Sequence, residues 1–491
     1  MTLPAEIYSV ASVRAIDEAA INDAGIGGYT LMTRAAEAAL DEAQARFPDA
    51  RRWQIICGSG NNGGDGYVLA RLVAGRGIGV SVLAVSSPDS LTGDAATAYQ
   101  DFAAEGGAAA MYEGSLDEEA ELLVDALLGS GLERDVEGPF AEVVEAINRH
   151  GAPVLALDVP SGLNADTGSV MGVAVQADLT VTFVGLKRGL FLKDGPKYVG
   201  DLRFSGLDIP AECLATQQAV QQRIDEDAIR PLLAPRKSNA HKGDFGHVLI
   251  VGGGPGMSGA VRLCGEAALR SGAGLVSVAT HPSHHAMIAS GRPELMCHAV
   301  ETAADLKPLL ARATVIALGP GLGTGKWSNS MFAAVMKSDL PMVVDADALN
   351  LLSQSELRKP DWILTPHPGE AARLLESSTA EVQEDRGGSL AQVVERYGGT
   401  VVLKGAGSLV ATADGPTWLC SAGNPGMAAP GMGDVLTGII AALRAQGLSA
   451  EMAAAAGVDI HARAGDAAAE SGQRGMMASD LLQELRAWVN P

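Results

Sequence analysis

One segment of the sequence has residue types and spacing that suit the transfer of a phosphoryl group. A small-residue loop starts at Asn424 and ends in Gly431-Met432-Gly433, and an apolar run follows it. Glycines at the start of a helix can present successive N–H groups to an anion, which the helix dipole also favours. Asp434 falls in the first helical turn, where it can accept a proton from an attacking hydroxyl. We predict an anion-binding turn with Asp434 as base, and a mere capping turn is the alternative.

Three more loops in the same half of the chain follow predicted strands. The segment from Lys404 to Ser408 supplies a cation and exposed amides, which suits nucleotide phosphates or ribose, although a hairpin turn has the same composition. The glycine-rich stretches 252–260 and 319–323 permit close approach of a ligand, and we assign them to the acceptor side.

Acidic and imidazole side chains add to this set. Asp345 and Asp347 could hold Mg²⁺ through water, with a helix cap as the alternative for Asp347. His367 could reach a substrate with a neutral donor. We predict no metal site at the neighbouring His281, His284 and His285, because no carboxylate or thiolate ligand pattern accompanies them.

The first half of the chain carries a second group of strand-end motifs. Gly58 to Gly66 has the GxGxxG spacing that lets a backbone approach a diphosphate at a helix N-terminus. A dinucleotide-dependent dehydrogenase would also show an acidic residue at the end of the next strand, and residues 80–87 contain none. A glycine-rich turn without a ligand is the alternative, although two Asn and one Asp make it more polar than a turn requires.

Two further carboxylates follow predicted strands in this half, Asp125 before a glycine loop and Asp158 before Pro160-Ser161-Gly162. Ligands bind at the carboxyl ends of strands in an open parallel sheet, so these loops should converge. Asn62, Asp125 and Ser161 offer hard oxygen ligands, which suit an alkali or alkaline-earth cation better than zinc. Asp158 could transfer a proton. Each residue taken singly could equally be a cap or turn residue.

Short apolar runs alternate with helical patterns in both halves, which is typical of parallel α/β sheets. The predicted strands are 53–57, 80–85, 122–126 and 154–157, then 246–251, 275–279, 315–318, 342–344, 362–364 and 401–403. A helix is predicted over 31–47, and residues 433–488 are predicted to be mostly helical. The stretch 210–242 lacks strand alternation, so we expect a connector there, with a short helix, and a domain boundary near Val220.

The composition of the 491 residues limits the classes of function. A net charge of −22 argues against nucleic-acid binding. Five widely spaced cysteines without a CxxC pair indicate neither a disulfide framework nor a zinc site. The N-terminus lacks a signal-peptide pattern, and no apolar run is long enough to span a membrane. We expect a cytoplasmic protein that binds a small molecule, contacts neither nucleic acid nor membrane, and forms a homo-oligomer.

Together these segments resemble the bifunctional NAD(P)H-hydrate repair enzymes, which join an NAD(P)HX epimerase domain to an ADP-dependent NAD(P)HX dehydratase domain. The resemblance covers nearly the whole chain and is most specific at 61–66, 158–164, 241–243 with 246–253, and 424–438. It implies an α/β protein with a Rossmann-like three-layer αβα sandwich over residues 1–219 and a ribokinase-like domain over residues 220–491.

The resemblance also implies the residues of both sites. In the epimerase domain the hydrated NADH or NADPH would contact Asn61, Asn62, Gly63, Gly64, Asp65, Gly129, Ser130, Gly131, Leu132, Glu133, Arg134, Asp135 and Asp158. Potassium would be held by Asn62, Asp125 and Ser161, and Asp158 would be the acid/base. In the dehydratase domain the hydrate would face Ala260, Gly321, Leu322, Gly323, His367 and Asp434. ADP or AMP would face Lys404, Gly405, Ala406, Gly407, Ser408 and Gly433.

By this resemblance, ADP phosphorylates the C6 hydroxyl of the hydrate, with Mg²⁺ as an accompanying ion, and loss of phosphate restores NAD(P)H. Two other functions remain open from the sequence. A ribokinase-like kinase acting on a small alcohol would use the same turn at Gly431 to Asp434. A binding protein without turnover is the second alternative, but it does not explain carboxylates at both Asp158 and Asp434.

Overall fold

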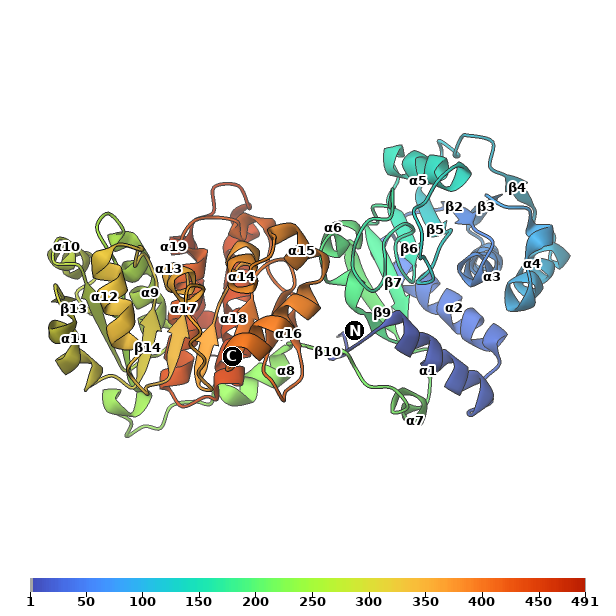
Figure 1. The fold of residues 1–491 in the computed structure, drawn as a ribbon. Coiled ribbons are helices and arrows are strands. Elements are labelled where there is room, and N and C mark those ends of the chain that lie inside the picture. Colours follow the sequence, from blue (N-terminus) through green and yellow to red (C-terminus); the bar gives the residue numbers. More distant parts are fainter. Residues whose placement is uncertain (1–2, 491) are drawn as a thin grey trace. The chain divides into compact units, whose positions relative to one another are not determined.

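The computed structural model describes residues 3–490, and it divides the chain into two compact units between Gln221 and Gln222. The boundary predicted from the sequence lies two residues earlier, between residues 219 and 220. Figure 1 shows that each unit is built from a sheet with helices packed on it. None of the described helices has the length and apolar character needed to cross a membrane.

The first unit follows the β/α alternation predicted for it. Its strands are β1 (Glu6–Tyr8), β2 (Arg52–Cys57), β3 (Gly79–Ala84), β4 (Ala109–Met111), β5 (Leu122–Ala126), β6 (Val154–Leu157), β7 (Leu179–Phe183), β8 (Leu186–Lys187) and β9 (Asp201–Ser205). Its helices are α1 (Val10–Asn22), α2 (Gly28–Arg46), α3 (Asn61–Gly75), α4 (Gly93–Ala104), α5 (Pro139–Arg149), α6 (Gly195–Tyr198) and α7 (Ala211–Leu214).

The main sheet of the first unit is wholly parallel, with strand order β4-β3-β2-β5-β6-β7-β9. Side chains of a strand alternate between the two faces of a sheet, and here both faces are buried. Ile55 packs in a core with α1 to α4, whereas the adjacent Ile56 packs in a second core with α5. This unit is therefore a three-layer αβα sandwich, as predicted.

The second unit begins in the stretch expected to be a connector. That expectation was wrong in part, because β10 (Gln221–Arg223) pairs in parallel with β19. A strand of three residues, paired with a partner almost 200 residues later, leaves no alternation to detect in the sequence. The short helix α8 (Glu226–Ile229) follows β10.

The remaining elements form the second α/β unit. Its strands are β11 (His247–Val251), β12 (Leu275–Thr280), β13 (Met296–Ala299), β14 (Val315–Leu318), β15 (Met342–Val344), β16 (Trp362–Leu364), β17 (Thr400–Leu403), β18 (Ser408–Ala411) and β19 (Trp418–Cys420). Its helices are α9 (Ser258–Arg270), α10 (His285–Gly291), α11 (Ala303–Leu310), α12 (Lys326–Val335), α13 (Asp347–Leu352), α14 (Pro368–Leu375), α15 (Thr379–Glu384), α16 (Arg386–Tyr397), α17 (Met432–Ala445), α18 (Ala450–Ala468) and α19 (Ala478–Trp488).

The sheet of the second unit runs β13-β12-β11-β14-β15-β16-β17-β18-β19-β10. It is parallel from β13 to β17, and β18 then turns back antiparallel. The helices α9, α17, α18 and α19 share one apolar core against the strands. Figure 1 shows the C-terminal helices α17, α18 and α19, in orange-red and red, beside the central strands of this unit. The carboxyl ends of the parallel strands therefore carry the loops predicted to form the site.

Candidate functional sites

The first unit has a cavity of about 890 Å³ at the carboxyl ends of its strands. Predicted residues that line it are Asn61, Asn62, Asp65, Gly129, Ser130, Gly131, Leu132, Glu133, Arg134 and Asp158. Gly63 and Gly64 are buried in the first turn of α3, where an added Cβ at Gly63 would lie 2.2 Å from the carbonyl oxygen of Gly58. Asp135 is exposed, outside the lining residues. The predicted loops therefore converge on one cavity.

Asp158 is held in this cavity by an ion pair that the sequence analysis missed. Lys187 lies on β8, is only 1% exposed, and donates a hydrogen bond to Oδ1 of Asp158. The same ammonium group donates to the hydroxyl of Thr182 at 3.1 Å and to the carbonyl oxygen of Phe183 at 2.8 Å. Asp158 has a φ of +66°, a left-handed conformation uncommon for a residue with a side chain. Strain of this kind concentrates at functional sites.

Two further carboxyl groups line the same cavity, Asp17 of α1 and Asp65 of α3. Burial raises the pKa of Asp17 to about 6, and Asp158 adds to that rise. Burial, with the charges of Asp158 and Asp17, also raises the pKa of Asp65 well above its ordinary value. The cavity thus combines the ion-paired carboxylate of Asp158 with the carboxyl groups of Asp17 and Asp65, which favour the protonated form. Such different environments let one carboxyl group act as a base and another as an acid.

All three predicted cation ligands are buried. Asp125 is fully buried, and its Oδ1 accepts a hydrogen bond of 2.6 Å from the Ser161 hydroxyl. Burial raises the pKa of Asp125 to about 6, despite hydrogen bonds from Ser161 that lower it. Asn62 is 7% exposed, and within residues 3–490 neither polar atom of its side chain has a hydrogen-bond partner. Oxygen donors and an unpartnered amide oxygen fit a hard monovalent cation.

In the second unit, Gly431 initiates α17 in the left-handed conformation, with φ of +89°. Asp434 follows in the first turn, as predicted. Burial raises the pKa of Asp434 to about 7, and the charge of Asp345 adds to the rise while Lys404 opposes it. A carboxyl group with a pKa near neutrality suits a general base, because it is deprotonated yet still able to take a proton.

Lys404 and Asp345 form the centre of this site. The ammonium of Lys404 donates to Oδ1 of Asp345 at 2.8 Å, and the Thr437 hydroxyl donates to Oδ2 at 2.7 Å. Burial by itself would lower the pKa of Lys404, but Asp345 and Glu370 outweigh burial and raise it. A Cβ added to Gly433 would lie 3.3 Å from the Lys404 nitrogen. The predicted nucleotide residues Lys404 and Gly433 are therefore brought together. Asp345, which was suggested from the sequence as a Mg²⁺ ligand, holds Lys404, and Thr437, which was not predicted, holds Asp345.

The acceptor loops meet at the ends of β11 and β14. The N–H of Gly254 donates to the carbonyl oxygen of Gly321 at 2.7 Å, and an added Cβ on Gly321 would lie 3.0 Å from that of Ala260. Asp347 accepts from the N–H of Gly323 at 2.8 Å. The side chain of Leu322 is fully buried, so a ligand at this loop would meet only its backbone.

His367 caps α14 with its Nδ1, which accepts from the N–H of Gly369 at 3.0 Å. Its Nε2 lies 3.4 Å from Oε1 of Glu370, and half of the side chain is exposed. Burial, helped by Lys404 and Arg373, lowers the pKa of His367. The imidazole is therefore neutral, with its proton on Nε2, as the predicted donor role requires.

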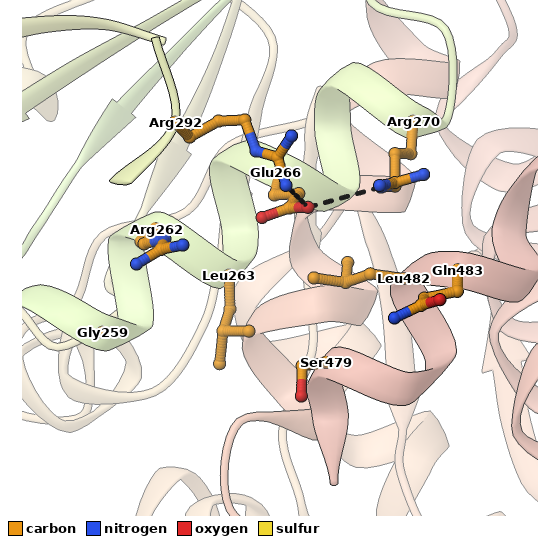
Figure 2. Close-up of a pocket in the computed structure, with 9 residues that line it drawn as sticks. All are labelled: Gly259, Arg262, Leu263, Glu266, Arg270, Arg292, Ser479, Leu482 and Gln483. Carbon is orange, nitrogen blue, oxygen red and sulfur yellow. Dashed lines mark hydrogen bonds and ion pairs between the residues drawn. The ribbon is translucent and has the colours of Figure 1, made fainter. Parts of the chain in front are cut away.

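A cavity of about 480 Å³ in this unit lies between α9 and α19 and is shown in Figure 2. Three arginines line it, Arg262, Arg270 and Arg292, together with Glu266. The carboxylate of Glu266 pairs with Arg270 at 3.4 Å and with Arg292. Leu263, in the wall of the cavity, also lies against Gly431. A Cβ added to Gly431 would lie 2.6 Å from Cδ1 of Leu263. The cavity is thus structurally adjacent to the start of α17.

Glycine turns and carboxylates at the carboxyl ends of parallel strands define a class of α/β enzymes that act on phosphorylated ligands. Models of two protein families match the chain. The family described as NAD(P)H-hydrate dehydratase matches residues 248–487, and the family described as YjeF-related protein N-terminus matches residues 28–189.

Relatives match the chain over its whole length. The chain is 48% identical over 486 residues to a bifunctional NAD(P)H-hydrate repair enzyme of Coxiella burnetii, covering 99% of both chains. It is 43% identical to the enzyme of that name from Escherichia coli, covering 100% of this chain and 95% of the other. A ribokinase-like superfamily protein from Enterococcus faecalis, 28% identical, has a similar structure, with a TM-score of 0.51 over 55% of this chain and 96% of that one. The chain belongs to the family of bifunctional NAD(P)H-hydrate repair enzymes, which confirms the resemblance and the predicted fold classes.

Proposed function

We propose that this chain restores hydrated nicotinamide cofactors in two steps, one in each unit. The first unit interconverts the C6 epimers of NADHX and NADPHX. The second unit dehydrates the S epimer with ADP, and it releases AMP, phosphate and NAD(P)H. The observation that carries the proposal is the group formed by Asp434, Lys404 and Asp345 at the start of α17.

Dehydration needs a better leaving group than hydroxide. Asp434 accepts the proton of the C6 hydroxyl while that oxygen takes the β-phosphoryl group of ADP, and AMP leaves. The ring nitrogen then expels phosphate from C6, and loss of a proton from C5 restores the dihydropyridine. Lys404 and the N–H groups at Gly431 to Gly433 stabilise the charge on the transferring phosphoryl group.

The remaining predicted residues hold the two ligands. Ala260, the backbone of Gly321 to Gly323, and the Nε2–H of His367 contact the hydrate. Lys404 to Ser408 and Gly433 contact the nucleotide. Mg²⁺ would shield nucleotide phosphate charge when bound, and it would be held by those phosphates and Asp347, because Asp345 is committed to Lys404 and Thr437.

Epimerisation at C6 proceeds when the C6–O bond breaks as the hydroxyl oxygen takes a proton and leaves as water, and water then adds to the opposite face of the ring and returns that proton. Asp158 is the acid/base, and Lys187 keeps its carboxylate in position. The hydrate lies against Asn61 to Asp65 and Gly129 to Arg134, which places its phosphates near the start of α3. Asn62, Asp125 and Ser161 would hold K⁺, whose charge would compensate the buried carboxylate when bound.

The two activities are complementary, because Asp434 is fixed and can reach the hydroxyl of only one C6 configuration. A second site must therefore interconvert the epimers for complete repair. We further propose a cytoplasmic homo-oligomer. Cytoplasmic location is consistent with five free cysteines, four of them buried.

The test is incubation of the purified chain with a mixture of NADHX epimers, with and without ADP, while the absorbance of NADH is followed. We expect recovery of the whole mixture only when ADP is present. No recovery with ADP, or phosphorylation of a small alcohol instead, would reject this function in favour of a kinase.

A further inference from the structure

Arg386 is a buried residue beneath the Lys404–Ser408 turn that has not been assigned a role above. It begins α16 and is only 5% exposed. Its guanidinium donates to the carbonyl oxygens of Leu403 at 3.2 Å, Lys404 at 3.4 Å and Gly407 at 3.1 Å, and to Oε1 of Gln383 at 3.0 Å. Arg386 therefore joins both arms of the turn between β17 and β18.

The part of the chain that the structure describes supplies no negative partner to this guanidinium. Among residues 3–490, no carboxylate forms an ion pair with Arg386, and its Nε has no hydrogen-bond partner. Burial lowers the pKa of Arg386 to about 10, which still leaves it charged at neutral pH. A buried charge without a counter-ion is costly, so it is retained where an anion can compensate it.

The turn itself is shaped around this arginine. Gly405 has a φ of +145°, and a Cβ added there would lie 2.7 Å from a guanidinium nitrogen of Arg386. Gly405 and Ala406, at the tip of the turn, are exposed, whereas Gly407 is buried. The carbonyl groups near the ends of the turn thus face the arginine, and its tip faces solvent where a ligand can bind.

We propose that Arg386 is a positioning residue for the nucleotide: it fixes the Lys404–Ser408 turn and supplies an uncompensated positive charge to the phosphates of a nucleoside diphosphate. This inference rests on the proposed function, which assigns the turn to the nucleotide. Arg386 does not touch the ligand. It acts through the carbonyl groups that it holds and through its positive charge. ADP has one phosphate more than AMP, so this charge attracts ADP more strongly.

The test compares Arg386→Gln, which removes the charge and keeps an amide donor, with Arg386→Lys, which keeps the charge. Calorimetry on the full chain gives the Kd of ADP and of AMP, and steady-state kinetics gives the KM of ADP and of the hydrate. Arg386→Gln should raise the Kd of ADP about tenfold and the Kd of AMP by less, while the KM of the hydrate stays unchanged. Arg386→Lys should weaken the binding of both ADP and AMP but keep the wild-type ratio of their affinities.

Two controls report on folding. Epimerase activity shows whether the first unit is intact, and thermal unfolding without ligand reports on the second. The matched variant is Arg444→Met, which removes an arginine that pairs with Asp361 at 3.0 Å on the same unit. Arg444→Met should leave ADP binding unchanged.

Wild-type ADP affinity in a folded Arg386→Gln would overturn the inference, and so would equal losses of ADP and AMP affinity. If Arg386→Gln does not fold, Arg386→Lys decides, because a changed ratio of ADP to AMP affinity in that variant would contradict the charge-based role. A wild-type chain that does not bind ADP would instead reject the proposed nucleotide site.

Discussion

Asp434→Asn should stabilise the second unit at pH 8 while it strongly slows dehydration. Burial raises the pKa of this carboxyl group from 3.8 to about 7, so the folded state disfavours the ionised form. The associated cost is absent below the unfolded pKa, grows as the pH rises, and is complete above the folded pKa. A shift of this size corresponds to ~4 kcal/mol at pH 8, of which ~3 kcal/mol develops between pH 5 and pH 8.

Tryptophan fluorescence during urea unfolding can measure this change. Four of the five tryptophans lie in the second unit, at positions 327, 362, 418 and 488, and only Trp53 lies in the first. A Trp53→Phe background therefore makes the signal specific to the second unit. We expect the unfolding free energy of Asp434→Asn to exceed that of its parent by ~3 kcal/mol more at pH 8 than at pH 5.

Catalysis gives the second half of the test. Dehydration by Asp434→Asn should fall by about 10² to 10⁴, the usual contribution of a general base, while epimers still equilibrate. A stability gain equal at both pH values would show that burial does not penalise the charge of Asp434. Substantial dehydration by the variant would show that Asp434 is not the base.

Further predictions concern both sites. The dehydration rate of the wild type should fall about tenfold per pH unit below pH 7, because Asp434 becomes protonated, and a flat profile from pH 5 to 8 would contradict this. Asp158→Ala should leave the R epimer unrepaired once spontaneous exchange is subtracted, whereas full, fast repair would remove its assigned role. Lys187→Met should slow epimerisation while dehydration of pure S epimer continues, as measured by chiral chromatography of the remaining hydrate. Asp125→Ala should abolish any stimulation of epimerisation by K⁺ over Na⁺, and unaltered stimulation would exclude it as a ligand.

The strands that position the sites were predictable from local patterns. β5, β6, β14, β15 and β16 have the predicted bounds, because continuous apolar runs buried on both faces stand out between polar turns. β7 and β9 were missed, as were β13, β18 and β19. The three-residue strand β10 was missed as well, since it is too short to show alternation and pairs with β19, which is distant in the sequence.

Residues in motifs were also predictable, whereas residues that position them were not. Asp434 stands out because a glycine turn precedes it and an apolar helix follows it. No comparable motif surrounds Lys187. It lies on β8, which is only two residues long, and its burial cannot be recognised from the neighbouring sequence. Arg386 is similar, because its sequence position beside Asp385 suggests an ordinary helix start rather than a charge beneath a turn 18 residues later.

The sequence by itself determined the parallel α/β architecture, the family, and the polar loops that follow its strands, since these features depend on local residue order and periodicity. Only the tertiary structure decided which charges meet. Lys187 reaches Asp158 across 29 residues, and Lys404 reaches Asp345 across 59. The electrostatic state of each site depends on such contacts and on burial, because the strength of a charge interaction depends on distance and on the exclusion of water. Neither quantity is present in the sequence until the chain has folded.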